Sequence, residues 1–153
     1  MSVYDKLSSL GITLKAPATP VAAYVMWVQT GNLVFLSGHI SKNPDGTVIA
    51  GKLGQQLSTE QGQQAARACG LDLLDTLQEA CGGDLNRVKR IVKVMSLVNS
   101  TPEFIEQHLV TNGVSELLVE VFGDAGKHAR SAFGVAQNPR GASVEVEMIV
   151  ELA

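Results

Sequence analysis

The chain closes with an alternating segment, VEVEMIVEL, at residues 144–152. Successive side chains of a β-strand point to opposite faces of the sheet. One face of this segment is therefore entirely apolar and carries Val144, Val146, Met148, Val150 and Leu152. The other face carries three glutamates, Glu145, Glu147 and Glu151, beside Ile149. The pattern predicts a strand that packs on a core with one face, and three acidic residues indicate that the other face is partly wet or holds a site.

Four more segments are predicted to be strands. The β-branched run Val88–Val98 predicts a long strand, and Ala129–Ala136 predicts a shorter one just before the last. Near the start, Ala23–Gln29 and Leu33–Leu36 are joined through Thr30-Gly31-Asn32. Because glycine and asparagine supply the positive φ of a tight turn, these two segments are expected to pair as a hairpin.

Two helices are expected between the strands. The first begins at Ser58, where Gln61 completes a capping box, and it stops at Gly82-Gly83. The second helical region begins at Thr101-Pro102, with Pro102 at the first helical position, and it ends over Gly123–Gly126.

The order of these segments is β-β-α-β-α-β-β, which predicts a single α+β domain over residues 1–153. Two helices are expected to cover one face of a mixed sheet. Residues 1–20 form an N-terminal extension with a short amphipathic turn of helix at residues 3–10, and we expect this extension to belong to the same domain.

Composition narrows the classes of partner. The net charge is −3 and the isoelectric point is about 5.6. Proteins that bind phosphate backbones usually carry a basic surplus, so nucleic acid is disfavoured as a partner. The mean hydropathy of +0.14 fits either an apolar face buried against other subunits or a core rich in alanine and valine. Composition leaves both explanations open.

The sequence favours a cytoplasmic protein without a metal or cofactor. It has no apolar run of the length of a signal peptide or a membrane span. Cys69 and Cys81 lie too far apart along the predicted helix for a disulfide, which is typical of core residues in a reducing compartment. The histidines show no metal-ligand spacing and are interpreted as polar surface or loop residues: His39, His108 and His128.

Arg130 stands at the start of an otherwise small and apolar strand. A half-buried guanidinium needs a carboxylate partner or an anionic ligand, and its planar fork suits a small carboxylate. Glu145, on the following strand, is expected either to pair with Arg130 across the strands or to act as an acid and base. The residues alone leave both hypotheses open.

Four short segments occur along the chain in a characteristic order: Tyr24, then Gly31-Asn32 leading into Leu36-Ser37-Gly38, then His128-Ala129-Arg130-Ser131, and finally Val144-Glu145-Val146-Glu147. In these segments the chain resembles the RidA family, the YjgF-like reactive-intermediate imine deaminases. The most specific parts are the Ala-Arg-Ser segment and the fifteen-residue step from Arg130 to Glu145. The resemblance runs from about Tyr24 to the C-terminus.

The resemblance implies a chorismate-mutase-like fold and a homotrimer with three sites in the clefts between subunits. It implies hydrolytic deamination of small imine or enamine acids to 2-oxo acids and ammonia. Arg130 would bind the substrate carboxylate, and Glu145 would hold and polarise the attacking water while staying ionised beside Arg130. The expected substrate-binding residues are Tyr24, Ser37 and Gly38 in the pocket wall, Asn112, and Ala132 through its main chain.

The chain is longer than the family, with its own N-terminal segment through about Pro20, and it departs from the family pattern at three further places. His128 stands where the best-studied members have proline, Ala22-Ala23 replace a common glycine, and Asn112–Gly126 differs in length and pattern. These departures indicate a divergent subfamily, and a changed pocket implies a changed substrate. Two alternatives follow: a trimer that binds a small carboxylate without turnover, and an endoribonuclease or translation inhibitor, which the acidic charge and the single tryptophan disfavour.

Overall fold

The computed structural model describes residues 1–153 and confirms the predicted α+β class. The predicted series β-β-α-β-α-β-β is present and follows a short N-terminal helix, α1. Short 3-10 turns at Leu85–Arg87, Gly123–Gly126 and Pro139–Gly141 lie in the connections. The main elements are α1 Val3–Ser9, β1 Trp27–Thr30, β2 Leu33–Ile40, α2 Thr59–Ala80, β3 Val88–Asn99, α3 Gln107–Phe122, β4 Ala129–Val135 and β5 Val144–Leu152.

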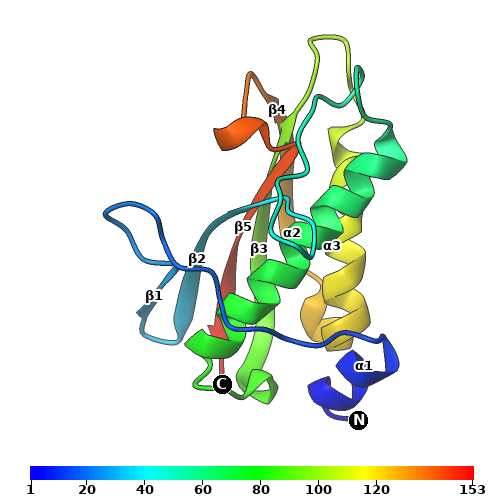
Figure 1. Ribbon diagram of the computed structural model, residues 1–153. Coiled ribbons are helices and arrows are strands. Elements are labelled where there is room, and N and C mark those ends of the chain that lie inside the picture. The colour runs from blue at the N-terminus through cyan, green and yellow to red at the C-terminus, as the bar shows by residue number, and fades with distance from the viewer.

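The five strands form one mixed sheet in the order β1-β2-β5-β3-β4 (Figure 1). All neighbours are antiparallel except β3 and β4, which run parallel. The last strand of the chain therefore lies in the middle of the sheet, and β4 forms an edge. Because β3 separates β4 from β5, residues of these two strands are not cross-strand neighbours.

The predicted hairpin is confirmed, but its first strand is shorter than expected. β1 starts at Trp27 and not at Ala23, and Trp27 lies opposite Leu36. The reason is a β-bulge in β2. Its register with β5 shifts between Leu36 and His39, so that Ser37 and Gly38 share the place of one residue. The regular ladder with β1 ends where this bulge begins.

The first long helix begins and ends as predicted. The Oγ of Ser58 accepts a hydrogen bond from the Gln61 backbone, and the Gln61 side chain accepts one from the Ser58 N–H. Gly82 and Gly83 follow the helix with φ of +67° and +93°. The capping box and the two glycines therefore set the length of α2. None of the helices is both long and apolar enough to cross a membrane.

The predicted start of the second long helix is wrong. α3 begins at Gln107, not at Thr101-Pro102. The N–H of Thr101 donates to the carbonyl of Leu53 at 3.1 Å, and the Gln107 side chain donates to the carbonyl of Phe104 at 2.8 Å. These contacts hold the segment before α3 in a non-helical conformation beside the loop at Leu53. A proline at a potential helix start gives no sign of such contacts.

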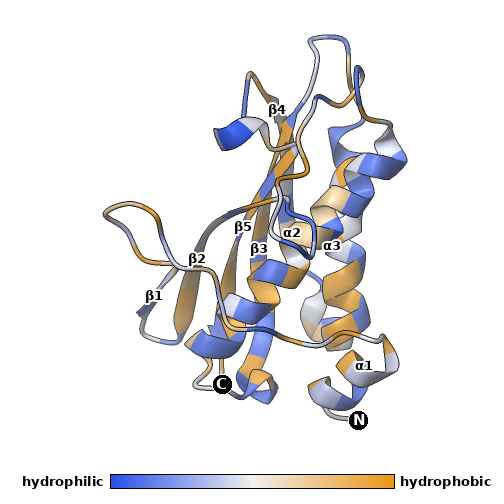
Figure 2. Cartoon of the chain, in the orientation of Figure 1, coloured by the Kyte–Doolittle hydropathy of each residue, from blue (hydrophilic) through white to orange (hydrophobic).

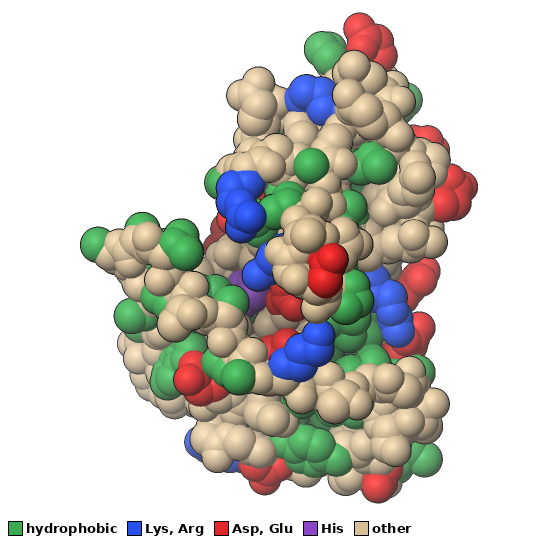
Figure 3. All heavy atoms as spheres, in the orientation of Figure 1, with side chains coloured by type: hydrophobic (Ala, Val, Ile, Leu, Met, Phe, Trp, Pro, Cys, Tyr) green, Lys and Arg blue, Asp and Glu red, His purple; other side chains and the backbone are tan.

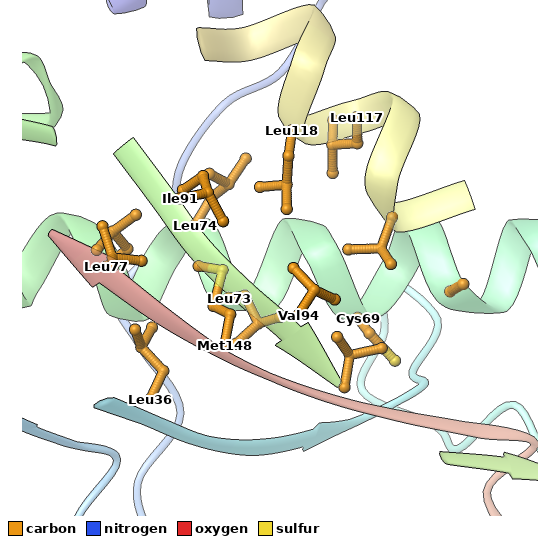
Figure 4. Close-up of a cluster of buried hydrophobic side chains, with 14 of the residues drawn as sticks. Leu36, Cys69, Leu73, Leu74, Leu77, Ile91, Val94, Leu117, Leu118 and Met148 are labelled. Atoms are coloured by element: carbon orange, nitrogen blue, oxygen red, sulfur yellow. The ribbon is translucent and has the colours of Figure 1, made fainter. Parts of the chain in front are cut away.

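The core lies between the sheet and two helices. α2 and α3 run side by side over one face of the sheet (Figure 1), and their inward sides are apolar (Figure 2). Side chains from both helices interlock with β2, β3 and β5 (Figure 4). The apolar face of β5 is buried as predicted: Val144, Val146, Met148, Val150 and Leu152.

The other face of the sheet has no covering layer within this chain. It carries the glutamate side of β5 together with large apolar residues from neighbouring strands. Val28 on β1, Phe35 on β2 and Phe133 on β4 are 54%, 42% and 43% exposed. An exposed apolar sheet face of this kind is typical of an interaction surface.

Candidate functional site

Arg130 is held by α3 through neutral acceptors. Its Nη1 donates to Oδ1 of Asn112 at 2.8 Å and to Oγ of Ser115 at 3.3 Å. Its Nη2 donates to the carbonyl of His108 at 3.1 Å. No carboxylate lies within ion-pair distance of Arg130. The guanidinium is therefore fixed in place while its charge has no counter-ion in the chain.

Part of the Arg130 guanidinium remains free to bind a ligand. An arginine side chain has five N–H donors. The three bonds to α3 use both donors of Nη1 and one of Nη2, which leaves one N–H on Nη2 and the N–H of Nε. These two nitrogens lie on one edge of the guanidinium and match the two oxygens of a carboxylate. The site can therefore grip a small carboxylate through two parallel hydrogen bonds.

A hydrogen-bond relay runs from Arg130 to His128. The Nδ1 of His128 lies 2.6 Å from the carbonyl of Gly126, so this nitrogen carries the proton and donates. The Nε2 lies 2.9 Å from Oγ of Ser115 and accepts its hydroxyl proton. Burial lowers the pKa of His128, the Gly126 carbonyl opposes that shift, and the charge of Arg130 adds to the lowering. A neutral His128 thus orients Ser115 to accept from Arg130.

Glu145 lies on the uncovered sheet face, beside the bulge in β2. An added Cβ at Gly38 would lie 3.0 Å from Cδ of Glu145, so the glutamate side chain occupies the space above this glycine. Burial raises the pKa of Glu145, and the charge of Glu147 raises it further. A half-buried carboxylate with a raised pKa holds a proton more readily than a free one, so it can take up a proton and return it.

Of the two hypotheses for Glu145, the cross-strand pairing with Arg130 is wrong within one chain. Arg130 is in register with Val94, and Val94 with Met148, so Arg130 points to the helix-covered face. Glu145 lies three residues from Met148 along the same regular ladder and therefore points to the opposite face. The charge of Arg130 does not lower the pKa of Glu145, contrary to the expectation that this group is ionised by its neighbour.

The other predicted site residues divide between the two faces. Asn112 contacts Arg130 directly, and Ala132 follows on the same strand in register with Ser96. Ser37 lies in the bulge next to Gly38, but its hydroxyl donates to the carbonyl of Val25 at 2.6 Å. Tyr24 is 48% exposed and lies in the loop before β1, not on a strand. The chain therefore forms two half-sites, one around Arg130 and one around Glu145.

Sequence reasoning missed Ser115 and the His108 carbonyl as groups that hold Arg130. Both belong to the helix that carries Asn112. The spacing of residues 108, 112 and 115 puts them on one side of a helix, one above the other. This spacing, together with an arginine on a neighbouring strand, was the sequence pattern that could have predicted Ser115 and His108 as partners of Arg130.

Comparison with known proteins assigns the family. The sequence pattern described as "YjgF/chorismate_mutase-like, putative endoribonuclease" matches residues 4–152. The chain belongs to the YjgF/RidA-like family. One YjgF/RidA-like relative, Protein TCP17 of Trypanosoma cruzi, is 50% identical over 98% of this chain and 94% of its own length. The 2-iminobutanoate/2-iminopropanoate deaminase of Dermatophagoides farinae is 30% identical over 86% of this chain and 87% of its own.

Solved structures of the family show the same fold. The protein Atu1372 from Agrobacterium tumefaciens superposes with a TM-score of 0.91 at 38% identity, over 99% of this chain and 92% of that one. A Shewanella oneidensis protein described as "a putative endoribonuclease" gives 0.94 at 27% identity, over 99% and 100% of the two chains. RidA from an Antarctic Psychrobacter gives 0.57 at 28% identity, over 90% and 93%. Family membership thus confirms the chorismate-mutase-like architecture, and the lower score against RidA fits a divergent subfamily.

Proposed function

We propose that the protein hydrolyses small 2-imino or enamine acids to 2-oxo acids and ammonia, in clefts between the subunits of a homotrimer. The observation that carries this proposal is the fixed guanidinium of Arg130, which has two free donors and no counter-ion. The relative from Dermatophagoides farinae and one from Mus musculus are both named 2-iminobutanoate/2-iminopropanoate deaminase, which supports the same reaction class. The free thiols Cys69 and Cys81 are both buried, which supports a reducing, cytoplasmic location.

The reaction needs orientation and one group that exchanges protons. Arg130 holds the substrate carboxylate and so fixes the neighbouring imine carbon. Glu145 removes a proton from a water molecule as the water oxygen bonds to the carbon of the protonated imine and the C=N double bond becomes single. Glu145 then returns that proton to the amine nitrogen of the carbinolamine. The C–N bond breaks and ammonia leaves, while the carbinolamine hydroxyl gives its proton back to the Glu145 carboxylate as the C=O bond of the 2-oxo acid forms.

The two half-sites support a location between subunits. Arg130 and Glu145 point to opposite faces of the sheet, so a single chain does not bring them to one substrate. The Glu145 face also exposes Phe35 and Phe133, which fits an interface with a neighbouring subunit. In a closed ring each interface pairs different surfaces of two subunits. The Arg130 of one subunit and the Glu145 of the next would then complete each site.

The direct test is the rate at which freshly generated 2-iminopropionate disappears, measured for the wild type, Arg130→Ala and Glu145→Ala. We expect acceleration by the wild type and loss in both variants, with the trimer intact by light scattering. Wild-type protein that leaves the rate unchanged across several 2-imino acids would contradict the reaction. Glu60→Ala, which replaces an exposed acidic residue on α2 in the helix layer, is a matched control for Glu145→Ala.

A mixing experiment tests the shared site separately. Arg130→Ala and Glu145→Ala subunits are unfolded together, refolded as mixed trimers and assayed. If each site takes its arginine and glutamate from different subunits, about a quarter of the sites in a random mixture are intact. Recovery of roughly that share of wild-type activity is expected. Continued inactivity of well-formed mixed trimers would place both groups in one subunit.

The first alternative is a trimer that binds a small carboxylate without turnover. A substitution of Glu145 distinguishes the binding protein from the deaminase, because binding requires Arg130 alone whereas hydrolysis requires Arg130 and Glu145. If Glu145→Ala retains affinity for 2-oxobutyrate and the wild type shows no hydrolysis, the binding function holds. Ribonuclease activity is the second alternative, and RNA cleavage that vanishes after stringent repurification would remove it. The acidic surface disfavours this alternative, since it repels a phosphate backbone.

A further inference from the structure

A pocket lies on the helix side of the molecule, and neither Arg130 nor Glu145 lines it. Its volume is about 450 Å³, a size that accommodates a small metabolite. Three segments form its walls: residues 11–18 of the N-terminal extension, the turn at residues 42–46, and the middle of α2. Figure 3 shows acidic and basic side chains gathered around a hollow on this side of the molecule.

The wall made by the N-terminal extension is fixed to the domain. The hydroxyl of Tyr4 accepts from the Leu85 N–H at 2.9 Å and lies 2.9 Å from the carbonyl of Gly83. The N–H of Val3 donates to Asn86, and Leu7 is buried in the core. The segment then crosses in front of α2 (Figure 1). Ile12 and Leu14, which line the pocket, also pack against the core, so this wall is anchored to the domain.

Two carboxylates one helical turn apart lie in the pocket wall and lack full compensation. The Oδ2 of Asp72 is buried without a hydrogen bond, since the Lys42 ammonium lies 3.8 Å away. Asp75 accepts only one backbone N–H, from Lys15, at 2.7 Å. Burial raises the pKa of both groups, and Asp72 raises that of Asp75 further. A cationic ligand group at this point would relieve the cost of burying the two carboxylates.

Cationic and apolar groups line the rest of the pocket. Lys15 and Lys42 stand at the edge, and the Lys15 ammonium makes no ion pair or hydrogen bond within the chain. Between the charges lies an apolar surface from Ile12, Leu14 and Leu71. The lining therefore offers two anionic groups, two cationic groups and an apolar surface between them.

From this arrangement we propose that the pocket binds a small zwitterion with an apolar side chain, the simplest being a free aliphatic α-amino acid. The ammonium of the ligand lies against Asp72 and Asp75, its carboxylate faces Lys15 and Lys42, and its side chain packs on Leu14 and Leu71. This site uses neither Arg130 nor Glu145. The proposal therefore does not depend on the deaminase reaction.

The test measures binding of L-leucine by calorimetry and by shifts of the backbone amide NMR signals of residues 11–18. Two analogues separate the charges: 4-methylpentanoate lacks the ammonium, and 3-methylbutylamine lacks the carboxylate. We expect L-leucine to bind with a dissociation constant in the millimolar range or below, and each analogue to bind about tenfold more weakly or worse. Variants Asp72→Asn and Lys42→Met are each expected to weaken L-leucine binding at least about tenfold.

Three outcomes decide the proposal. Asp72→Asn removes a carboxylate that is poorly compensated, so the variant is expected to fold at least as well as the wild type while losing L-leucine. Glu60→Gln, an exposed acidic residue on the same helix, is the matched control and is expected to bind normally. Arg130→Ala is also expected to bind normally. Loss of binding in Arg130→Ala, undiminished binding in Asp72→Asn, or no wild-type binding at saturating L-leucine would each overturn the proposal.

Discussion

Gly38 leaves the space that the carboxylate of Glu145 fills. An added Cβ at this glycine would lie 3.0 Å from Cδ of Glu145 and closer still to Oε1. The backbone of Gly38 does not have the positive φ that favours glycine, so its value to the fold lies in the absent side chain. The bulge in β2 thus fixes where the carboxylate on β5 can lie.

Gly38→Ala is expected to displace Glu145 without unfolding the protein. The clash falls on the end of a flexible side chain, so the free energy of unfolding should drop by less than about 1.5 kcal/mol. Proposed deaminase kcat should fall at least about tenfold, because misplacing a proton-transfer group acts on the chemical step. Steady-state kinetics and urea unfolding check both. An unchanged kcat in Gly38→Ala beside an inactive Glu145→Gln would disconnect the glycine from the site.

Asn112→Asp is expected to damage carboxylate binding more than Asn112→Ala does. Alanine only removes one bond that orients Arg130. Aspartate adds a carboxylate of nearly the same shape at 2.8 Å, which neutralises the guanidinium and competes with the ligand. KM for the imino acid, or Kd for 2-oxobutyrate, should rise by about tenfold or more in Asn112→Asp. Equal effects of the two substitutions would mean that the charge of Arg130 does not bind the ligand.

The buried side chain of His39 is expected to lower the stability of the protein in mild acid. It is buried on β2, so its interpretation as a surface or loop residue is wrong; its Nδ1 donates to the Ser37 carbonyl, and its Nε2 accepts from Thr76. Burial lowers its pKa below 6.5, although the Ser37 carbonyl and Asp72 oppose the shift. Below about pH 6.5 the unfolded chain binds a proton that the folded protein does not, so the free energy of unfolding falls by up to about 1.4 kcal/mol per pH unit until the lowered pKa is reached.

Denaturant unfolding between pH 7.5 and 5 measures this slope, with His39→Gln expected to reduce it. The exposed His108→Gln is the control and should keep the wild-type slope. Asp72, Asp75 and Glu145 have raised pKa values and act with the opposite sign, since they weaken stability as pH rises through the range above their ordinary values. The contribution of His39 to the slope of unfolding free energy against pH is therefore measured at the upper end of this pH range.

Two glycines between α2 and α3 allow a paired test of helix packing. An alanine at Gly113 would meet the backbone of Gln63, with its carbonyl carbon 2.8 Å from the new Cβ. An alanine at Gly62 would meet only side-chain methyl groups of Leu53 and Val110. Because backbone cannot move aside, Gly113→Ala should lose about 2–3 kcal/mol of unfolding free energy and Gly62→Ala clearly less. Thermal unfolding of the two variants decides the order.

The sequence correctly predicted those helices, turns and strands whose ends depend on residues that are close together in the chain. The capping box at Ser58, the hairpin turn at Gly31 and the alternation of β5 each involve residues within a few positions of one another, and all three are confirmed. The start of α3 was missed because its determinant is the contact of Thr101 with Leu53, nearly fifty positions earlier. The first strand was overextended for the same reason, since the bulge that ends its ladder lies on the partner strand.

The candidate site shows the same division. The sequence predicted Arg130 as a site residue because an arginine is unusual among small apolar strand residues. In the structure Arg130 has hydrogen-bond acceptors but no counter-ion. Its relation to Glu145 was not visible. The fifteen-residue spacing does not reveal that β3 lies between β4 and β5 in the sheet. It also does not reveal that the side chains of Arg130 and Glu145 point to opposite faces of the sheet.

The attachment of α1 has a consequence for the order in which the protein takes shape during synthesis. Val3 bonds to Asn86, 83 positions further along the chain. At about 5–20 residues per second, the ribosome needs roughly 4 to 17 s to make that partner after Val3 has been added. A segment that is made early is thus placed late. The pocket that it closes against α2 exists only after the helix behind it has formed.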